Sequence, residues 1–339
     1  MTTEYLIIEP WLRDALQARA LQAAFDLGFI DVLAASESVC ETRLVRDERC
    51  DAAGLHFLLE ILSGAGAVNI GTSGVQLTEE FRAVLRFRDL LQTKLSFAEL
   101  VAPDFFARLP QLLNSTDQFM ATSQLFELFD YSRCQEITPQ NCLQASRWMQ
   151  LTTMLTRYEA PVCCDQFDFS CSRNMLDAGG NSGEFAVQVC RRNSKLMATV
   201  ADLPVVCHVG ARHVAQFPES GRIQFQPLHF LLEDFPVGHD LITFKSVLHD
   251  WPVQEVELLL AKAWSALPSG GRILIFERLE WDPSRTPFSY GLLPVLLFFR
   301  SYRSPDVYLE LLRRLRFQHF TVQTVDLDMR FMIVSGSKP

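Results

Sequence analysis

The spacing of apolar residues changes near the middle of this 339-residue chain. Apolar positions recur with a helical period from Glu9 to Leu33 and from Ala52 to Ala65, and residues 81–158 are also mostly helical in pattern. After the second of these stretches, two short runs flank the segment from Gly71 to Gly74, which predicts a β-hairpin. We therefore expect a helical first half that contains one small two-stranded sheet.

Helices that precede a two-stranded hairpin are typical of a winged-helix module, which commonly binds DNA. The formal net charge of the chain is −9, so the basic surface that nucleic acid requires is not indicated. Leu12, Leu16, Phe25 and Leu33 instead predict an apolar surface that a small helical module could not bury alone. We expect residues 1–95 to form a dimerisation domain and the protein to be a homodimer.

From Phe167 onward, short apolar runs alternate with helical patterns. The predicted strands are Met175–Ala178, Leu196–Ala201, Ile223–Gln226, Leu241–Val247 and Arg272–Phe276. This alternation predicts an α/β domain over residues 166–339, built on a parallel, doubly wound sheet. Residues 96–165 would then form a helical linker that borders a substrate pocket.

A glycine-rich loop separates the first predicted strand from the helical pattern that starts at Glu184. Gly179, Gly180 and Gly183 lack a Cβ, so a ligand can approach the backbone, where free N–H groups of the helix N-terminus face it. The spacing matches neither the phosphate-binding loop nor the dinucleotide motif. An acid, Asp202, ends the next strand, where a carboxylate suits a ribose diol. The pattern favours a nucleoside ligand.

In a doubly wound sheet, ligands bind at the carboxyl ends of the strands. The glycine-rich loop, Asp202, the segment after Phe225 and the end of the fourth predicted strand should therefore lie near one another. That fourth strand runs into residues 248–252, and Pro252 fits the first turn of the helix that follows. His249 is then expected at the strand end, facing the cleft.

Composition argues against several other classes of protein. No apolar run is long enough to span a bilayer, and the N-terminus lacks the pattern of a secretory signal. The nine cysteines include no C-x-x-C pair and no metal-ligand spacing, which predicts free thiols in a reducing cytoplasm and no bound metal. We expect a cytoplasmic protein with a small-molecule substrate and neither a membrane nor a nucleic-acid partner.

Several motifs stand in the order in which one enzyme family carries them. They are Phe167–Ser170, Leu176–Gly183, Ala201–Pro204, Lys245–Trp251 and Leu267–Glu277. With these motifs the chain resembles, over nearly its whole length, the class I S-adenosylmethionine-dependent small-molecule O-methyltransferases of the caffeate and acetylserotonin type. The resemblance implies a Rossmann-like catalytic domain behind a winged-helix dimerisation domain, with S-adenosylmethionine as the cofactor.

Matched by position, the resemblance implies which residues bind the cofactor. Gly179 and Gly183 would lie against its methionine part, Asp202 would hold the ribose, and Lys245 would lie near the adenine. The full cofactor-binding set is Asp177, Gly179, Gly180, Gly183, Asp202, Leu203, Phe230 and Lys245.

The resemblance also implies His249 as the general base for a hydroxyl acceptor, assisted by Glu277. Histidine suits proton removal near neutral pH, and a carboxylate can orient the imidazole and stabilise its cation. Methyl transfer from a sulfonium is an in-line displacement, so such an enzyme mainly positions the two reactants.

The chain departs from the family pattern at three places. Asn181 replaces the third glycine of the loop, which Asn can support because it tolerates a left-handed backbone. Residues 228–230 lack the acid of the family's Gly-Asp-Phe motif, although Phe230 can still stack on adenine. Tyr302 stands where a second glutamate assists the histidine. A thioether acceptor, as in S-methylation of 4-methylthio-2-hydroxybutyrate in the dimethylsulfoniopropionate pathway, is therefore an alternative because sulfur needs no deprotonation.

The expected acceptor pocket combines apolar side chains with a cation. Phe126, Trp148 and Met149 would form its wall together with Tyr302, and Arg303 would hold a substrate carboxylate. Two other functions stay open at this point. One is a protein that binds S-adenosylmethionine without transferring methyl, and the other is a winged-helix regulator with a ligand-binding domain.

Overall fold

The computed structural model describes residues 3–45, 50–123, 130–285 and 287–339. The chain divides into two compact units. Glu4–Leu113 and Pro287–Leu296 make up one, which we call the helical unit. Met1–Thr3, Asn114–Thr286 and Leu297–Pro339 make up the other, which we call the α/β unit. The short late segment of the helical unit has no counterpart in the predicted domain boundaries.

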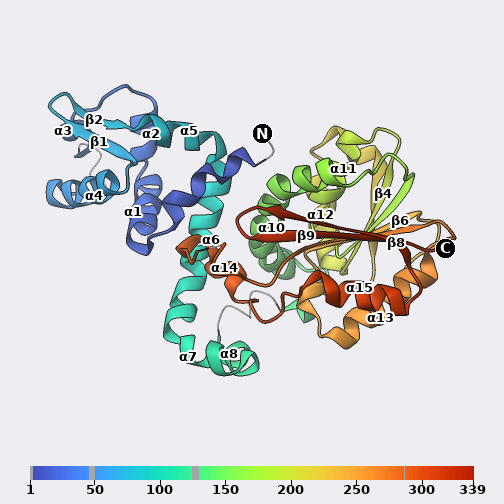
Figure 1. The fold of residues 1–339 in the computed structure, drawn as a ribbon. Helices are drawn as coiled ribbons and strands as arrows, with labels where there is room; N and C mark the ends of the chain where they lie inside the picture. Colours follow the sequence, from blue (N-terminus) through green and yellow to red (C-terminus); the bar gives the residue numbers. More distant parts are fainter. Residues whose placement is uncertain (1–2, 46–49, 124–129, 286) are drawn as a thin grey trace. The chain divides into compact units, whose positions relative to one another are not determined.

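The helical unit combines short helices with a single hairpin (Figure 1). Its elements are η1 (Glu4–Leu12), α1 (Ala15–Asp26), α2 (Phe29–Ala34), α3 (Glu41–Val45), α4 (Ala52–Gly64), β1 (Val68–Gly71), β2 (Gly74–Leu77), α5 (Glu79–Val84), η2 (Leu85–Phe87), α6 (Arg88–Ala107), α7 (Leu109–Asn114), η6 (Tyr290–Leu292) and α14 (Leu293–Leu296). The side chains of Asp14, Asp51 and Thr78 accept backbone hydrogen bonds at the starts of α1, α4 and α5. As predicted, β1 and β2 pair antiparallel, with Gly71 opposite Gly74.

The apolar surface predicted for dimerisation is mostly internal. Leu12, Phe25 and Leu33 are buried, so the prediction was wrong for these three residues. The reason is that η1, α2, α4 and α6 all pack against α1 within the same chain. Leu16 alone of the four is exposed, with 60% of its surface accessible.

The α/β unit is built on a seven-stranded sheet with the order β5-β4-β3-β6-β7-β9-β8. Its strands are β3 (Asn174–Ala178), β4 (Met197–Asp202), β5 (Ile223–Pro227), β6 (Leu241–Lys245), β7 (Arg272–Arg278), β8 (Gln318–Asp326) and β9 (Arg330–Ser337). The first five are parallel, as predicted. The sheet is nevertheless mixed, because β9 pairs antiparallel with both β7 and β8. The edge strand β8 was not predicted, because it is largely exposed and carries little apolar alternation.

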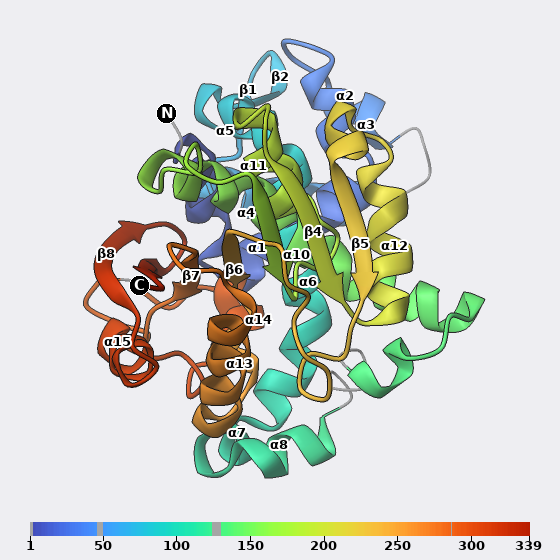
Figure 2. The ribbon, with the colours of Figure 1, turned by 90° about the vertical axis from the view of Figure 1, so that its right-hand side faces the viewer.

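Helices cover both faces of this sheet (Figures 1 and 2). The described helices of the α/β unit are α8 (Thr116–Thr122), η3 (Tyr131–Cys134), α10 (Pro139–Gln166), α11 (Glu184–Arg192), α12 (Pro204–Val214), η4 (Pro218–Arg222), η5 (Leu248–Asp250), α13 (Val253–Ala266) and α15 (Pro305–Arg314). Helices α10, α11 and α12 pack together on one face, and α13 and α15 lie on the other. The strand order reverses between β3 and β6, and ligand crevices of doubly wound sheets form at such a reversal.

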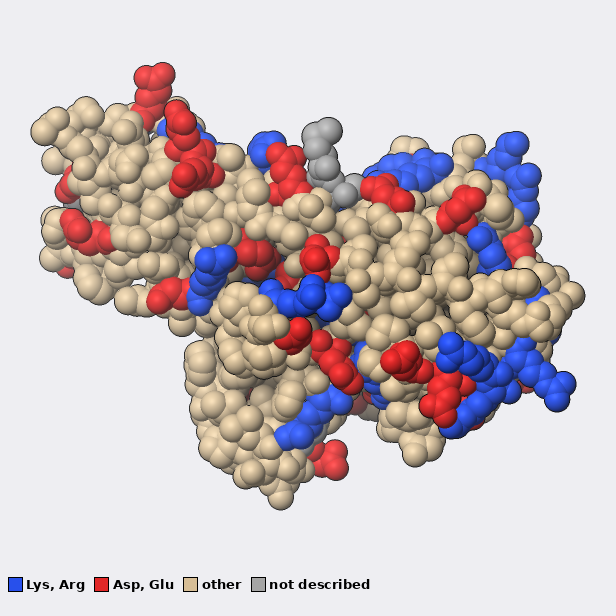
Figure 3. Space-filling view, viewed as in Figure 1, with Lys and Arg blue, Asp and Glu red and all other residues tan. Residues whose placement is uncertain are grey.

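The surface shows no single-sign patch on the face drawn in Figure 3, where acidic and basic side chains are interspersed. Among the described residues, no helix has the length and apolar character to cross a membrane. All nine cysteines carry free thiols, as predicted.

Candidate functional site

The loop after β3 has a backbone that only certain residues adopt. Gly179 and Gly183 have φ angles of 69° and 77°, and Asn181 has a φ of 56°, all in the left-handed region. The expectation that Asn supports this conformation is confirmed. A Cβ on Gly180 would lie 2.4 Å from Oδ2 of Asp177, so no larger residue fits there. The loop therefore passes directly over the Asp177 carboxylate.

Asp177 is fully buried at the end of β3. Its Oδ1 accepts a hydrogen bond of 2.7 Å from the Thr243 hydroxyl, whereas Oδ2 has no hydrogen-bond partner in the described part of the chain. Burial raises the pKa of Asp177 to about 7, although the Thr243 hydroxyl and the nearby Lys245 charge act in the opposite direction. A buried carboxylate with an unpartnered oxygen suits a cationic ligand group.

Asp202, the acid predicted to hold a ribose, lies at the same loop. Its two oxygens accept hydrogen bonds from the backbone N–H groups of Asn181, at 2.9 Å, and Leu203, at 2.8 Å. Burial raises the pKa of Asp202 to about 6. Because a carboxylate oxygen accepts more than one hydrogen bond, Asp202 can fasten the loop to β4 and still receive hydroxyl donors.

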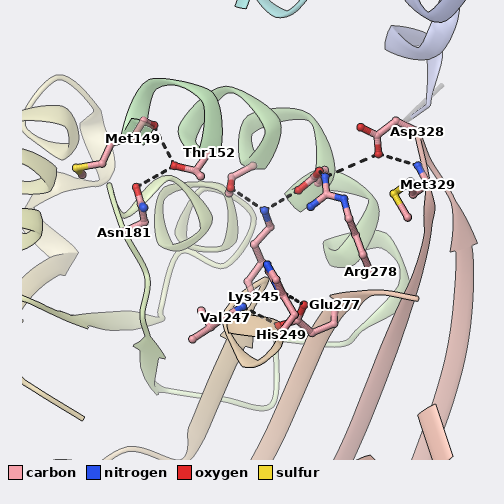
Figure 4. Close-up of polar contacts among 12 residues, drawn as sticks. Met149, Thr152, Asn181, Lys245, Val247, His249, Glu277, Arg278, Asp328 and Met329 are labelled. Carbon is pink, nitrogen blue, oxygen red and sulfur yellow. Dashed lines mark hydrogen bonds and ion pairs between the residues drawn. The ribbon is translucent and has the colours of Figure 1, made fainter. Parts of the chain in front are cut away.

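His249 lies in η5, just past the end of β6, and its ring contacts Glu277 (Figure 4). Its Nδ1 lies 2.9 Å from Oε2 of the buried Glu277. The other oxygen of Glu277 accepts hydrogen bonds from the N–H groups of Val247, at 2.6 Å, and Leu248, at 2.7 Å. One carboxylate on β7 thus fixes both the η5 backbone and the imidazole ring.

The charges around His249 and Glu277 favour the protonated form of the imidazole ring. Burial alone would lower the pKa of His249, but the carboxylates of Glu277 and Asp250 outweigh it, so its pKa is raised above the ordinary value. Burial likewise works against ionised Glu277, yet His249 and the two backbone donors lower the pKa of that carboxyl. Nε2 of His249 lies 3.4 Å from Asp250, longer than a usual N–H···O bond. Nε2 is therefore the ring atom left for an acceptor.

Aromatic side chains surround the ring. Phe298 meets it edge-on with 5.7 Å between ring centroids, and the Tyr302 ring lies tilted at 5.2 Å. Burial raises the pKa of Tyr302, so it remains a neutral phenol beside the imidazole. The Arg303 guanidinium donates to the carbonyls of Leu248, at 2.9 Å, and Trp251. The observed contacts of Arg303 thus brace the η5 turn that carries His249.

The residues predicted to form the wall of the acceptor pocket, and Phe230, predicted to stack on adenine, pack into cores where the structure describes them. Trp148 and Met149 are buried on α10 in a small cluster with residues of α12, and Trp148 meets Tyr131 edge-on at 5.8 Å. Phe230 packs edge-on against Trp251 at 5.7 Å in the main core of the α/β unit. Phe126 lies outside the described residues.

Sequence reasoning missed a polar stripe on α10. Lys245, expected near a ligand base, has its Nζ 2.6 Å from Oε2 of Glu159 and 2.8 Å from the Thr156 hydroxyl. Earlier on the helix, Thr152 contacts the Asn181 side chain at 3.3 Å, and the Thr153 hydroxyl contacts that of Ser182 at 2.7 Å. The available signal was polar residues at helical spacing among apolar residues of one helix. Among the described residues, no group of three or more His, Cys, Asp or Glu is arranged to hold a metal ion.

Known proteins are similar to this chain in sequence and in fold. Residues 112–318 match the family model of the O-methyltransferase domain. The 3-hydroxy-5-methyl-1-naphthoate 3-O-methyltransferase of Streptomyces sahachiroi is 36% identical over 148 residues, which are 44% of this chain and 43% of that protein. The L-tyrosine C(3)-methyltransferase of Streptomyces lavendulae is 30% identical over 120 residues, 35% of this chain and 33% of that protein. The matches therefore span less than half the length of either relative.

The fold itself matches over almost the whole chain. The crystal structure of human N-acetylserotonin methyltransferase in complex with S-adenosylmethionine has a TM-score of 0.73 and 23% identity, and the match covers 95% of this chain and 94% of that one. This likeness confirms the expected α/β fold preceded by a helical N-terminal region.

Proposed function

Since the chain belongs to the O-methyltransferase domain family, as the match over residues 112–318 shows, we propose that it transfers a methyl group from S-adenosylmethionine to a small-molecule hydroxyl. The observation that carries the proposal is the buried contact of 2.9 Å between Nδ1 of His249 and Glu277. This contact engages Nδ1 and leaves Nε2 as the ring atom for an acceptor, at the same sheet edge as the glycine-rich loop.

The loop residues fit the cofactor. Gly179 and Gly183 would lie against its methionine part, the unpartnered oxygen of the buried Asp177 suits a cation there, and Asp202 would receive the ribose hydroxyls. When bound, S-adenosylmethionine supplies the methyl group from its sulfonium. The single acid at the end of β4 and the tight passage over Asp177 support a nucleoside ligand.

His249 would take the acceptor proton at Nε2. Glu277 keeps the Nδ1–H tautomer in place, and the imidazolium that forms is stabilised by Glu277 and Asp250. The edge-on Phe298 and the tilted Tyr302 support a flat, aromatic acceptor. The name of the Streptomyces sahachiroi relative specifies a hydroxynaphthoate as the acceptor. The name of the Streptomyces lavendulae relative specifies tyrosine, a phenol, although that enzyme methylates carbon. Hydroxynaphthoates and phenols are therefore the first acceptors to try.

S-methylation of a thioether acid is the second candidate. The neutral Tyr302 beside His249 favours it, because sulfur needs no base. The engagement of Arg303 by two backbone carbonyls is against it, because that guanidinium was the predicted partner of the substrate carboxylate.

Single-turnover methyl transfer separates the two chemistries. Phenols, hydroxynaphthoates and 4-methylthio-2-hydroxybutyrate would be screened for release of S-adenosylhomocysteine. With a hydroxyl acceptor, the rate should rise with pH through the raised pKa of His249, and His249→Ala should lose about 10²- to 10⁴-fold in rate. The exposed His56 provides the matched control, His56→Ala. A flat pH profile together with an active His249→Ala would exclude the hydroxyl mechanism.

We further propose that the helical unit is a dimerisation module. Three of the four residues first expected at its surface are internal, but other large apolar side chains are exposed on it. Besides Leu16, they are Phe57, Ile70, Leu100, Phe106, Leu113 and Phe288. Light scattering should give twice the chain mass of 38.6 kDa, and a monomer mass at micromolar concentration would contradict the proposal.

A further inference from the structure

Four buried charges form a continuous chain across the α/β unit (Figure 4). Asp328, in the turn before β9, lies 3.8 Å from Nη2 of Arg278 on β7. The same Nη2 lies 2.5 Å from Oε1 of Glu159 on α10, and Oε2 of Glu159 lies 2.6 Å from Nζ of Lys245 on β6. Each of the four side chains is at least nine-tenths buried.

Glu159 is the centre of this chain because two cations share its carboxylate. Figure 4 shows Lys245 and Arg278 pointing from neighbouring strands toward the same helix. Buried charges are costly unless they are paired. Loss of the Glu159 charge would leave both buried cations without this shared carboxylate, and Arg278 would keep its longer contact with Asp328. Loss of Lys245 would instead leave Glu159 paired with Arg278.

The helix face that carries Glu159 also holds the glycine-rich loop. Thr152, Thr156 and Glu159 are four and three residues apart, so they lie on one face of α10. Thr152 contacts Asn181 at 3.3 Å, two turns before Glu159. Its neighbour Thr153 contacts Ser182 at 2.7 Å. The same face of α10 therefore contacts β6 and β7 through Glu159 and the glycine-rich loop through Thr152.

We propose that Glu159 is a positioning residue for the cofactor loop. By pairing Lys245 and Arg278 it holds α10 against β6 and β7, and α10 in turn supports Asn181 and Ser182. Lys245 then acts through α10 instead of as a direct ligand of the adenine. This inference rests on the proposed function, because it takes the glycine-rich loop as the cofactor site.

Calorimetric titration of the full chain with S-adenosylhomocysteine tests the proposal. Glu159→Gln should weaken binding about tenfold, and Lys245→Met should weaken it less. The double variant should bind better than Glu159→Gln alone, because it removes one stranded cation. Glu310→Gln is the matched control, since it breaks an exposed ion pair with Arg314 and should leave affinity unchanged. Binding weaker in Lys245→Met than in Glu159→Gln would overturn the proposal and identify Lys245 as a direct ligand.

If Glu159→Gln does not fold, a double-mutant cycle of Lys245→Met and Thr152→Val tests whether Lys245 acts through α10. Thr152→Val removes the loop contact without touching a charge. If Lys245 acts through α10, Lys245→Met and Thr152→Val should be less than additive, because both loosen the same contact. Full additivity would contradict the proposal. A wild-type chain that does not bind S-adenosylhomocysteine would overturn the proposed function as well, whereas normal wild-type binding with the reversed ranking overturns this inference alone.

Discussion

Two buried acids on β4 and β7 have pKa values shifted in opposite directions, although burial acts in the same direction on both. Asp202 and Glu277 each accept hydrogen bonds from two backbone N–H groups and are almost entirely shielded from solvent. Burial raises the pKa of Asp202 to about 6, whereas the pKa of Glu277 is lowered despite its burial. The difference is the partner, because Glu277 lies against an imidazole that can carry positive charge and Asp202 does not. One acid is already paired, and the other suits a ligand.

The pH dependence of folding stability should therefore have opposite signs for Glu277 and for the acids at the loop. The raised pKa values of Asp177 and Asp202 mean that the fold holds their protons more tightly than the unfolded chain does, so stability falls as pH rises through about 6 and about 7. The Glu277 contribution is present above the ordinary carboxyl pKa and is lost as pH falls through the lowered value. The His249 contribution is present at low pH and is lost as pH rises through its raised pKa.

The largest expected effect is on the methyl-transfer rate, when Glu277, the acid paired with His249, is replaced by a neutral residue. Glu277→Gln keeps the size of the side chain and an oxygen for the Val247 and Leu248 N–H groups. Its amide would then donate to Nδ1 of His249 and move the ring proton to Nε2, where the base must be free. We expect the methyl-transfer rate to fall about 10²- to 10⁴-fold with little change in S-adenosylhomocysteine affinity. A comparable loss of cofactor affinity would show that Glu277 mainly supports the fold.

The next largest effect is expected at Asp202, the acid proposed to bind the ribose. Asp202→Ala removes the bond to the Asn181 N–H and the proposed acceptor of the ribose hydroxyls. We expect a loss of about 1.5–3 kcal/mol in S-adenosylhomocysteine binding, as for hydrogen bonds to a charged group. Asp326→Ala, at an exposed strand end, serves as the control and should bind normally. Unchanged affinity in Asp202→Ala would remove Asp202 from the cofactor site.

Both acids could be predicted from the sequence, whereas some of their surroundings could not. The loop, Asp202, His249 and Glu277 were predictable because each follows a locally recognisable strand or turn. The pairing of Lys245 with Glu159 was not, because it joins a strand to a helix far away in the sequence and neither residue carries a local signal. The antiparallel pair of β8 and β9 was missed because β8 is largely exposed and carries little apolar alternation. The late segment Pro287–Leu296 was missed because its place in the helical unit depends on long-range packing.

A smaller effect should appear in the pH dependence of ligand affinity. The ammonium group of S-adenosylhomocysteine should favour ionised Asp177, whose pKa is about 7 in the free protein. Affinity should therefore rise between about pH 5 and pH 8, with release of part of a proton on binding. Calorimetry in two buffers of different ionisation enthalpy measures that release. In Asp177→Asn the dependence should flatten, and an unchanged slope would assign it to another group.

The smallest expected effect tests the hydroxyl that supports Asp177. Thr243 donates to Oδ1 at 2.7 Å, and this bond favours the ionised carboxylate. Thr243→Val has nearly the same shape and removes the donor, so the pKa of Asp177 should rise further and the increase of affinity with pH should move to higher pH. The lost hydrogen bond should cost about 1 kcal/mol of folding stability, measured by denaturant unfolding at pH 8. At pH 5, where Asp177 is protonated in both proteins, the difference in stability should shrink. An equal loss at both pH values would mean that Thr243 contributes packing alone and does not tune the carboxylate.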